Sequence, residues 1–205
     1  MSLSTYAALQ TTVAEFLNRD DLTATVPAFI TLAEASLNRD IRHWRMQSRS
    51  TPDLDAQYSA VPSDWMETIR FSLTGEGSKR LEPISHADLA SRRADYISGR
   101  PRFFAMTDGQ FELLPTPDGT YASELVYYAR LTALSDEAPS NWLLTYHPDA
   151  YLYGALVHSA PYLADDARSV VWASFYKAAV DAINSEGMNA DAGGSGLRIK
   201  VRGRR

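Results

Sequence analysis

The sequence contains no cysteine. Disulfide bonds, thiolate nucleophiles and zinc sites built on cysteine are therefore excluded, and the absence agrees with assembly in a reducing cytoplasm. No apolar run approaches the roughly 20 residues that a membrane-spanning helix needs. The N-terminal stretch MSLSTYAALQ lacks the basic region and apolar core of a secretory signal peptide. We therefore expect a protein that has no membrane partner.

Motifs that indicate an enzyme are also lacking. No serine has a nucleophile-elbow context, and the Gly75-Glu76-Gly77 segment lacks the strand, helix and Lys-Ser/Thr pair of a phosphate loop. Asp165 and Asp166 suit the start of a helix better than a metal site, because a helix N-terminus favours acids. None of the histidines falls in a metal-binding pattern; they are His43, His86, His147 and His158. We therefore expect no catalysis, no metal and no cofactor.

The composition that is present is ordinary for a globular protein. The chain has 205 residues, of which 45% are hydrophobic and 22% charged, enough for one domain with a core. The net charge of −5 is unevenly distributed, because five basic side chains lie in the last eight residues. Without them the chain stands at −10, with 15 basic against 25 acidic side chains. An acidic body therefore carries a basic tail.

Helical periodicity occupies both ends of the chain. Ser4 and Thr25 are candidate caps for two helices near the N-terminus, each with one apolar face. A third helix begins at Pro148, where a missing N–H costs nothing, and Pro161 ends or kinks it. The last helix covers residues 166–186, with Gly187 as its C-cap. The expected faces of the first two are Tyr6, Leu9, Val13, Phe16 and Leu17, then Phe29, Ile30, Ala33, Leu37 and Ile41.

The last helix carries two apolar stripes instead of one. We expect it to be buried on two sides, either within one subunit or against a neighbouring one. The stripes are Val171, Phe175, Ala178 and Ala182, and Trp172, Tyr176, Val180 and Ile183.

The middle of the chain predicts strands. Residues 66–73 and 121–131 read as strands, and residues 102–106 and 110–114 flank Asp108-Gly109, a hairpin turn signal. A short helix is expected after Ser85. Residues 47–64 are polar and contain two prolines, so we expect a loop. These patterns predict a small antiparallel meander.

The expected fold is mainly α: a four-helix-type bundle with a small antiparallel β insertion and an extended C-terminal tail. The bundle would take residues 1–45 and 140–187, the insertion residues 46–139, and a flexible basic tail residues 188–205.

The tail has its own pattern. After the Gly193–Gly196 linker, Leu197, Ile199 and Val201 alternate with basic residues, which is the period of an extended strand. Such a strand suits β-augmentation, in which a segment adds to a partner's sheet edge. A disordered basic end and a nucleic-acid arm remain as alternatives.

Two further groups of side chains have alternative interpretations. Tyr121, Tyr127 and Tyr128 would stack bases in a single-strand binder, but tyrosines on a half-buried strand more often belong to a core or interface. The pairs Arg92-Arg93 and Arg100/Arg102 read either as a solvated face or as a contact with an acidic neighbouring subunit.

Residues 141–163 resemble a segment of a known protein family. They read NWLLTYHPDAYLYGALVHSAPYL, rich in Trp, Tyr, Leu and Ala and without Lys, Arg or Glu. Asn141–Leu144, Pro148–Gly154 and Ala160–Leu163 resemble the closing helices of the head-to-tail adaptor (connector) proteins of tailed double-stranded DNA bacteriophages. Other matching segments fall in the same order as in that family: Phe16–Arg19, Asp21–Leu22, Phe29–Glu34, Leu37–Arg39, Pro62–Trp65 and Gly99–Pro101.

The resemblance implies a structural virion protein that forms a twelve-fold ring under the portal, extends the DNA channel and joins the capsid to the tail. Its partners would be the portal protein, copies of itself, tail or nozzle proteins, and DNA that passes without sequence-specific binding. It would lie at the head-tail junction of the virion after assembly in the host cytoplasm. The competing function is a nucleic-acid-binding module that acts through the basic tail.

The resemblance implies that the C-terminal segment docks on the portal, and we expect the helical body to pack against neighbouring subunits. The docking residues expected from this are Leu197, Arg198, Ile199, Lys200, Val201, Arg202, Arg204 and Arg205. The candidate subunit-interface residues are Trp142, Tyr153, Trp172, Tyr176, Arg100 and Arg102.

Overall fold

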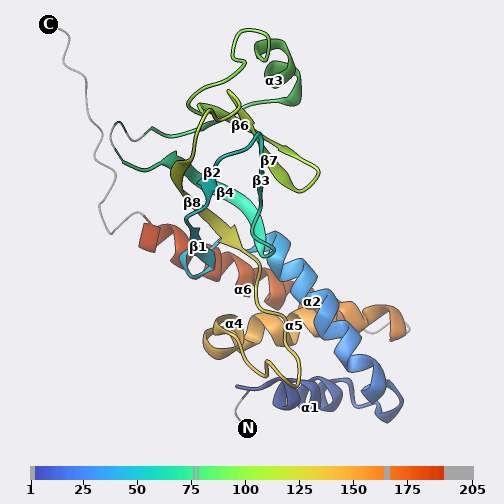
Figure 1. Ribbon diagram of the computed structural model, residues 1–205. Helices are drawn as coiled ribbons and strands as arrows, with labels where there is room; N and C mark the ends of the chain where they lie inside the picture. The colour runs from blue at the N-terminus through green and yellow to red at the C-terminus, as the bar shows by residue number, and fades with distance from the viewer. Residues whose placement is uncertain (1–2, 76, 78, 164–166, 192–205) are drawn as a thin grey trace, which may run out of the picture. The chain divides into compact units, whose positions relative to one another are not determined.

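The computed structural model of the protein describes residues 3–75, 77, 79–163 and 167–191 (Figure 1). Helices form at both ends of this chain and strands form in the middle. The chain divides into two compact units. Residues 46–130 make the strand unit, and the segments before and after them make the helical unit.

The mainly α bundle expected from the sequence is wrong. The chain is 47% helical and 23% strand, with two sheets of four strands each. Much of the missed strand content lies in residues expected to be a loop, which form β1 (Gln47–Ser50), β2 (Asp53–Leu54) and β3 (Tyr58–Ala60). These strands have only four, two and three residues, too few to show an alternation, and most of their side chains are polar. Only their pairing with longer strands identifies them.

The helical unit is organised around one central helix. Its elements are α1 (Tyr6–Leu17), α2 (Val26–Asp40), α4 (Trp142–Tyr146), α5 (Pro148–Ser159) and α6 (Arg168–Asp191), with 3₁₀ turns at Asp20–Thr25, Trp44–Met46 and Ala160–Tyr162. The helix α5 packs against α1, α2 and α6. Its Tyr151 is among the largest fully buried side chains of the described chain.

The helix ends follow the sequence closely. Thr5, one residue after the expected Ser4, caps α1 by accepting the N–H of Ala8 at 3.3 Å. The α1 helix ends at Asn18, whose backbone is left-handed with φ 52°. Asparagine tolerates that conformation, so the chain turns here without a glycine. Thr25 precedes α2, but its side chain makes no capping hydrogen bond.

A buried carboxylate fixes the segment that leads from the strands back to the helices. Glu34 of α2 accepts the N–H of Leu134 at 2.7 Å and the hydroxyl of Tyr151 at 3.3 Å. Asn141 donates to the same hydroxyl at 2.6 Å. Burial raises the pKa of Glu34, and the hydrogen bonds from Leu134 and Tyr151 oppose the rise. The carboxyl group therefore serves packing, with its Oε1 accepting both hydrogen bonds inside the unit.

The helix α6 does not end at Gly187, as the sequence predicted, but runs on to Asp191. The glycine has a different purpose. A Cβ atom at this position would lie 3.0 Å from the carbonyl oxygen of Arg42 and 3.1 Å from the Cα of His43. Both neighbours are backbone atoms, so Gly187 lets α6 approach the chain that follows α2.

Replacing Gly187 with alanine is expected to destabilise the helical unit by about 1–3 kcal/mol, the usual cost of overpacking. Alanine favours a helix over glycine by up to about 1 kcal/mol, so the clash outweighs the propensity. Chemical unfolding measures the difference. Gly119→Ala is the control, because a Cβ there meets nothing within 4 Å. An equally stable or more stable Gly187→Ala variant would show that the backbone contact can relax freely.

The strand unit contains two sheets. In the first, β8 (Tyr121–Ala129) is central, with β4 (Trp65–Leu73) antiparallel along one side and β1 and β2 antiparallel along the other. The second has the order β3-β7-β6-β5, with β5 (Glu82–Pro83), β6 (Phe103–Thr107) and β7 (Gln110–Leu114). Helix α3 (His86–Arg92), capped by Ser85 as expected, lies between β5 and β6 in the sequence.

The hairpin expected around Asp108-Gly109 is confirmed. It joins β6 to β7, and both turn residues have positive φ, 48° and 70°. The segment after Gly77 links the two sheets, since Leu81 donates to the carbonyl of Phe71 at 2.8 Å and Glu82 donates to that of Arg102 at 2.9 Å. Apolar side chains from both sheets form one core: Leu54, Phe71, Leu73, Leu81, Phe104, Phe111, Leu113, Leu125 and Tyr127.

Candidate functional site

The eight docking residues expected in the C-terminal tail, Leu197 to Arg205, lie outside the described residues. Their role stays a prediction. The other candidate residues are described, and they fall into an aromatic group in the helical unit and an arginine group in the strand unit.

Two of the aromatic candidates are half-buried. Trp142, the first residue of α4, stacks on the imidazole of His43 with ring centres 5.0 Å apart and planes 19° apart. Tyr153 of α5 packs beside Phe175 of α6, with ring centres 5.0 Å apart. Each ring therefore already has a partner within the chain and leaves part of its surface to solvent.

The other two aromatic candidates face into the helical unit. Trp172 is only 5% exposed, with the guanidinium of Arg168 5.1 Å from its ring centre. Tyr176 donates its hydroxyl to Asp40 at 2.9 Å, and burial raises its pKa above the usual range. Of the two stripes on α6, the one with Trp172 and Tyr176 thus belongs to the core of the subunit.

The second stripe of α6 is open. Val171 and Phe175 are each 48% exposed, and the adjacent Val170 is 74% exposed. We call these three residues the α6 apolar stripe. The sequence showed that α6 has two apolar sides but could not say which one faces the core. Phe175 was therefore missed as an interface candidate, although its neighbour Tyr176 was chosen.

A cluster of imidazoles joins α6 to the rest of the helical unit. His43 is completely buried, and its Nδ1 accepts the backbone N–H of Arg45 at 3.2 Å. Its Nε2 lies 3.7 Å from Oε1 of Glu186, while Nε2 of His147 lies 3.7 Å from Oε2 of the same carboxylate. Burial lowers the pKa of His43. The nearby carboxylate of Glu186 opposes this lowering, whereas His147 and Arg45 lower the pKa further. The neutral ring is therefore favoured at pH 7.

The stability of the protein is expected to fall as the pH drops below about 6.5, the ordinary value for histidine. Burial also lowers the pKa of His158, so the unfolded chain binds protons at both histidines before the folded chain does. Glu34 acts oppositely, because its raised pKa favours the folded state at acidic pH. We expect the histidines to dominate between pH 6.5 and 5.

Urea unfolding at a series of pH values tests this dependence. The variant His158→Gln should flatten part of the decline, because it removes one of the two histidines whose pKa is lowered by burial. A free energy of unfolding that rises as the pH falls from about 7 to 5.5 would contradict the assignment.

Neither a metal site nor a membrane-spanning helix is found within the residues that the structure describes. There, no three His, Cys, Asp or Glu side chains are grouped so as to hold a metal ion. Within the same residues, no helix combines the length and apolarity that crossing a membrane requires.

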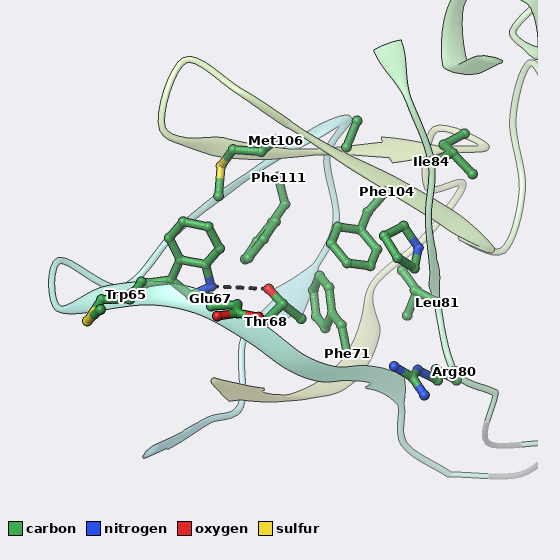
Figure 2. A pocket seen from close by; sticks show the side chains of 13 residues that line it. Trp65, Glu67, Thr68, Phe71, Arg80, Leu81, Ile84, Phe104, Met106 and Phe111 are labelled. Carbon is green, nitrogen blue, oxygen red and sulfur yellow. Dashed lines mark hydrogen bonds between the residues drawn. The ribbon is translucent and has the colours of Figure 1, made fainter. Parts of the chain in front are cut away.

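An apolar pocket of about 240 Å³ opens in the strand unit (Figure 2). Figure 2 shows its aromatic rings on facing strands, with the Trp65 indole donating to the Thr68 hydroxyl at 3.1 Å. Of the lining side chains only Glu67 and Arg80 are charged, so the pocket suits an apolar group. No local sequence pattern predicts this pocket, because its four rings come from three strands: Trp65, Phe71, Phe104 and Phe111.

The arginine candidates meet in a second hollow of about 290 Å³, which we call the cationic pocket. Lys79, Arg80, Arg100 and Arg102 line it, with Glu82 as its single acid. Arg100 donates to the carbonyl of Gly77 at 2.7 Å, and Arg80 donates to that of Ile69 at 3.2 Å. The sequence predicted Arg100 and Arg102 but missed Lys79 and Arg80, because only the fold brings the two segments together.

Two of the three tyrosines on β8 have their hydroxyls bound within the strand unit. Tyr127 is 4% exposed and donates its hydroxyl to Asp64 at 2.9 Å, as part of the strand-unit core. Tyr121 donates its hydroxyl to Asp118. These contacts support the core interpretation of the strand.

The chain is similar to one family of known proteins. No curated protein matches the chain. The family described as SU10 adaptor protein matches over residues 4–199, nearly the whole sequence. The resemblance to phage head-to-tail adaptors is thus confirmed at the level of the family, and the chain belongs to the SU10 adaptor protein family.

Proposed function

We propose that this adaptor is a structural, non-enzymatic subunit of a ring of twelve copies under the portal of a tailed phage. The ring would extend the DNA channel and join the capsid to tail or nozzle proteins at the head-tail junction, after assembly in the host cytoplasm. The family match supports the adaptor role. The observation that supports ring formation is the α6 apolar stripe, which is exposed to solvent in a single subunit.

The energy available from this stripe is substantial. Fully burying a valine or phenylalanine side chain is worth about 1.5–3 kcal/mol, and Val171 and Phe175 are each about half exposed. A closed ring needs two different complementary patches on every subunit, because each copy meets its two neighbours with opposite sides. The α6 apolar stripe is one such patch.

The C-terminal segment is proposed to dock on the portal. Its apolar side chains at Leu197, Ile199 and Val201 would add a strand to a sheet edge, and its basic side chains would meet acidic groups. Once one tail of a ring is bound, the others bind from a high effective concentration. A solitary subunit should therefore bind weakly, and the portal would template the ring.

The acidic body suits a channel for DNA. Without the last eight residues the chain carries a net charge of −10, and like charge on a channel wall repels phosphate. DNA would then pass through the ring without being retained by it.

Electron microscopy of the protein mixed with portal particles tests the proposal, with ring density beneath the portal as the expected result. Binding to duplex DNA, measured at about 50 and 200 mM salt, separates the competing function, because a phosphate binder loses affinity steeply over this range. Bare portal particles, together with tight and strongly salt-dependent DNA binding, would instead favour a nucleic-acid-binding module.

A further inference from the structure

We infer that the cationic pocket of one copy receives an acidic turn, residues 135–138, of a second copy. The inference rests on the proposed ring and names the contact between neighbouring subunits. It is carried by two described features, one in each unit of the chain, that are complementary in charge.

The cationic pocket is built to hold its charges in place. The guanidinium of Arg102 lies 5.9 Å from the ring centre of Tyr96. Arg80 and Arg100 are tied to backbone carbonyls. A guanidinium that packs on an aromatic face keeps its N–H edges available for a carboxylate.

The acidic turn presents two carboxylates at its tip. Asp136 and Glu137 are both exposed, and among the described residues neither has a hydrogen-bond or ion-pair partner. The backbone N–H of Ser135 donates to the carbonyl of Ala138 at 3.1 Å, and the N–H of Ala138 donates to the Ser135 hydroxyl at 3.0 Å. These two hydrogen bonds close the turn on itself.

The turn is also anchored on both sides. Leu134, just before it, donates its N–H to the buried Glu34 at 2.7 Å. Pro139, just after it, accepts the N–H of Tyr6 at 2.7 Å. Because the backbone is held in this way, little conformational entropy is lost when the two carboxylates bind.

Among the residues whose side chains the structure describes, no second adjacent acid pair is equally without partners. Asp21 of the Asp20-Asp21 pair is already bound to Arg19, and Asp165-Asp166 lies outside the described residues. Asp136-Glu137 is thus the described pair that remains available to a partner.

The charge of the strand unit favours a short acidic turn over DNA. Residues 46–130 hold twelve acidic and nine basic side chains, so the unit as a whole is acidic. A DNA duplex would extend over much of the unit, so its phosphates would be repelled by the acidic side chains outside the pocket. A turn with two carboxylates would interact mainly with the pocket itself, because charges beyond about 8 Å are screened at physiological salt.

Charge reversal on each side tests the contact. The pocket variant is Lys79→Glu/Arg102→Glu, the turn variant is Asp136→Lys/Glu137→Lys, and the rescue variant combines all four substitutions. Ring assembly on portal particles is measured by sedimentation and by electron microscopy. Each two-residue variant should assemble at least about tenfold less efficiently, and the rescue variant should return to within about threefold of the natural chain.

A matched control is Asp53→Lys/Asp55→Lys, which changes the net charge as much as the turn variant but at another exposed site. It should assemble normally. A rescue variant that assembles no better than the other two, or two-residue variants that assemble normally, would overturn the inference. So would a pocket variant that forms rings but loses salt-sensitive DNA retention, because the pocket would then serve phosphate. If the natural chain forms no ring on portal particles, the proposed function itself fails.

Discussion

Deleting residues 193–205 is expected to abolish binding to portal particles and to leave the free energy of unfolding unchanged. The deleted segment opens with the Gly193–Gly196 linker and contains only three apolar side chains, so its sequence offers little to a core. Portal binding, in contrast, is proposed to depend on this segment in every copy of a ring. Because the contacts of one ring act together, losing all of them should weaken binding by roughly a hundredfold or more.

Two substituted tails separate the contributions within the segment. Replacing Leu197, Ile199 and Val201 with serine keeps all five basic charges of the last eight residues and removes the apolar edge. We expect this variant to lose portal binding at every salt concentration. Replacing Arg198, Lys200 and Arg202 with glutamine keeps the apolar edge, and should reduce both the affinity and its salt dependence. A truncated protein that binds portal as well as the full chain would contradict the docking role.

Replacing Val171 and Phe175 with aspartate is expected to abolish ring assembly while the single subunit stays folded. Both side chains are half exposed in the isolated subunit, so aspartate remains hydrated there. In a ring the same positions would be buried, and an unpaired carboxylate in such an interface costs several kcal/mol. Thermal unfolding of the subunit and electron microscopy with portal particles measure the two effects separately.

The neighbouring position provides the opposite control. Trp172→Ala empties a site that is only 5% exposed and should cost about 3–5 kcal/mol of folding stability. The two variants therefore test the two sides of one helix. Normal rings from the Val171→Asp/Phe175→Asp variant would show that the stripe faces solvent in the assembly as well.

The sequence predicted the longer elements because their patterns are local. The strand β8, the hairpin around Asp108-Gly109 and the cap at Ser85 each depend on a few adjacent residues. The strands β1, β2 and β3 depend instead on pairing with β7 and β8, more than 45 positions further along the chain. A polar segment of two to four residues carries no pattern that predicts a pairing strand so far along the chain.

The candidate sites show the same division. Composition alone indicated that arginines gather near Arg100, but Lys79 and Arg80 join them only because the loop around Gly77 carries the chain from one sheet to the other. Gly187 suggested a helix end, since glycine commonly terminates helices. Its real constraint is a close approach to residues 42 and 43, which a sequence does not display.

The hydrogen bond between Tyr151 and Glu34 spans 117 positions of the chain. At a synthesis rate of roughly 5–20 residues per second, α2 leaves the ribosome about 6 to 23 seconds before its partner α5. During that time α1 and α2 lack the helix α5 against which they pack, whereas residues 46–130 already contain both of their sheets. Newly made subunits should therefore become competent for assembly only late in translation, and a nascent chain halted before α5 should be the species that chaperones hold.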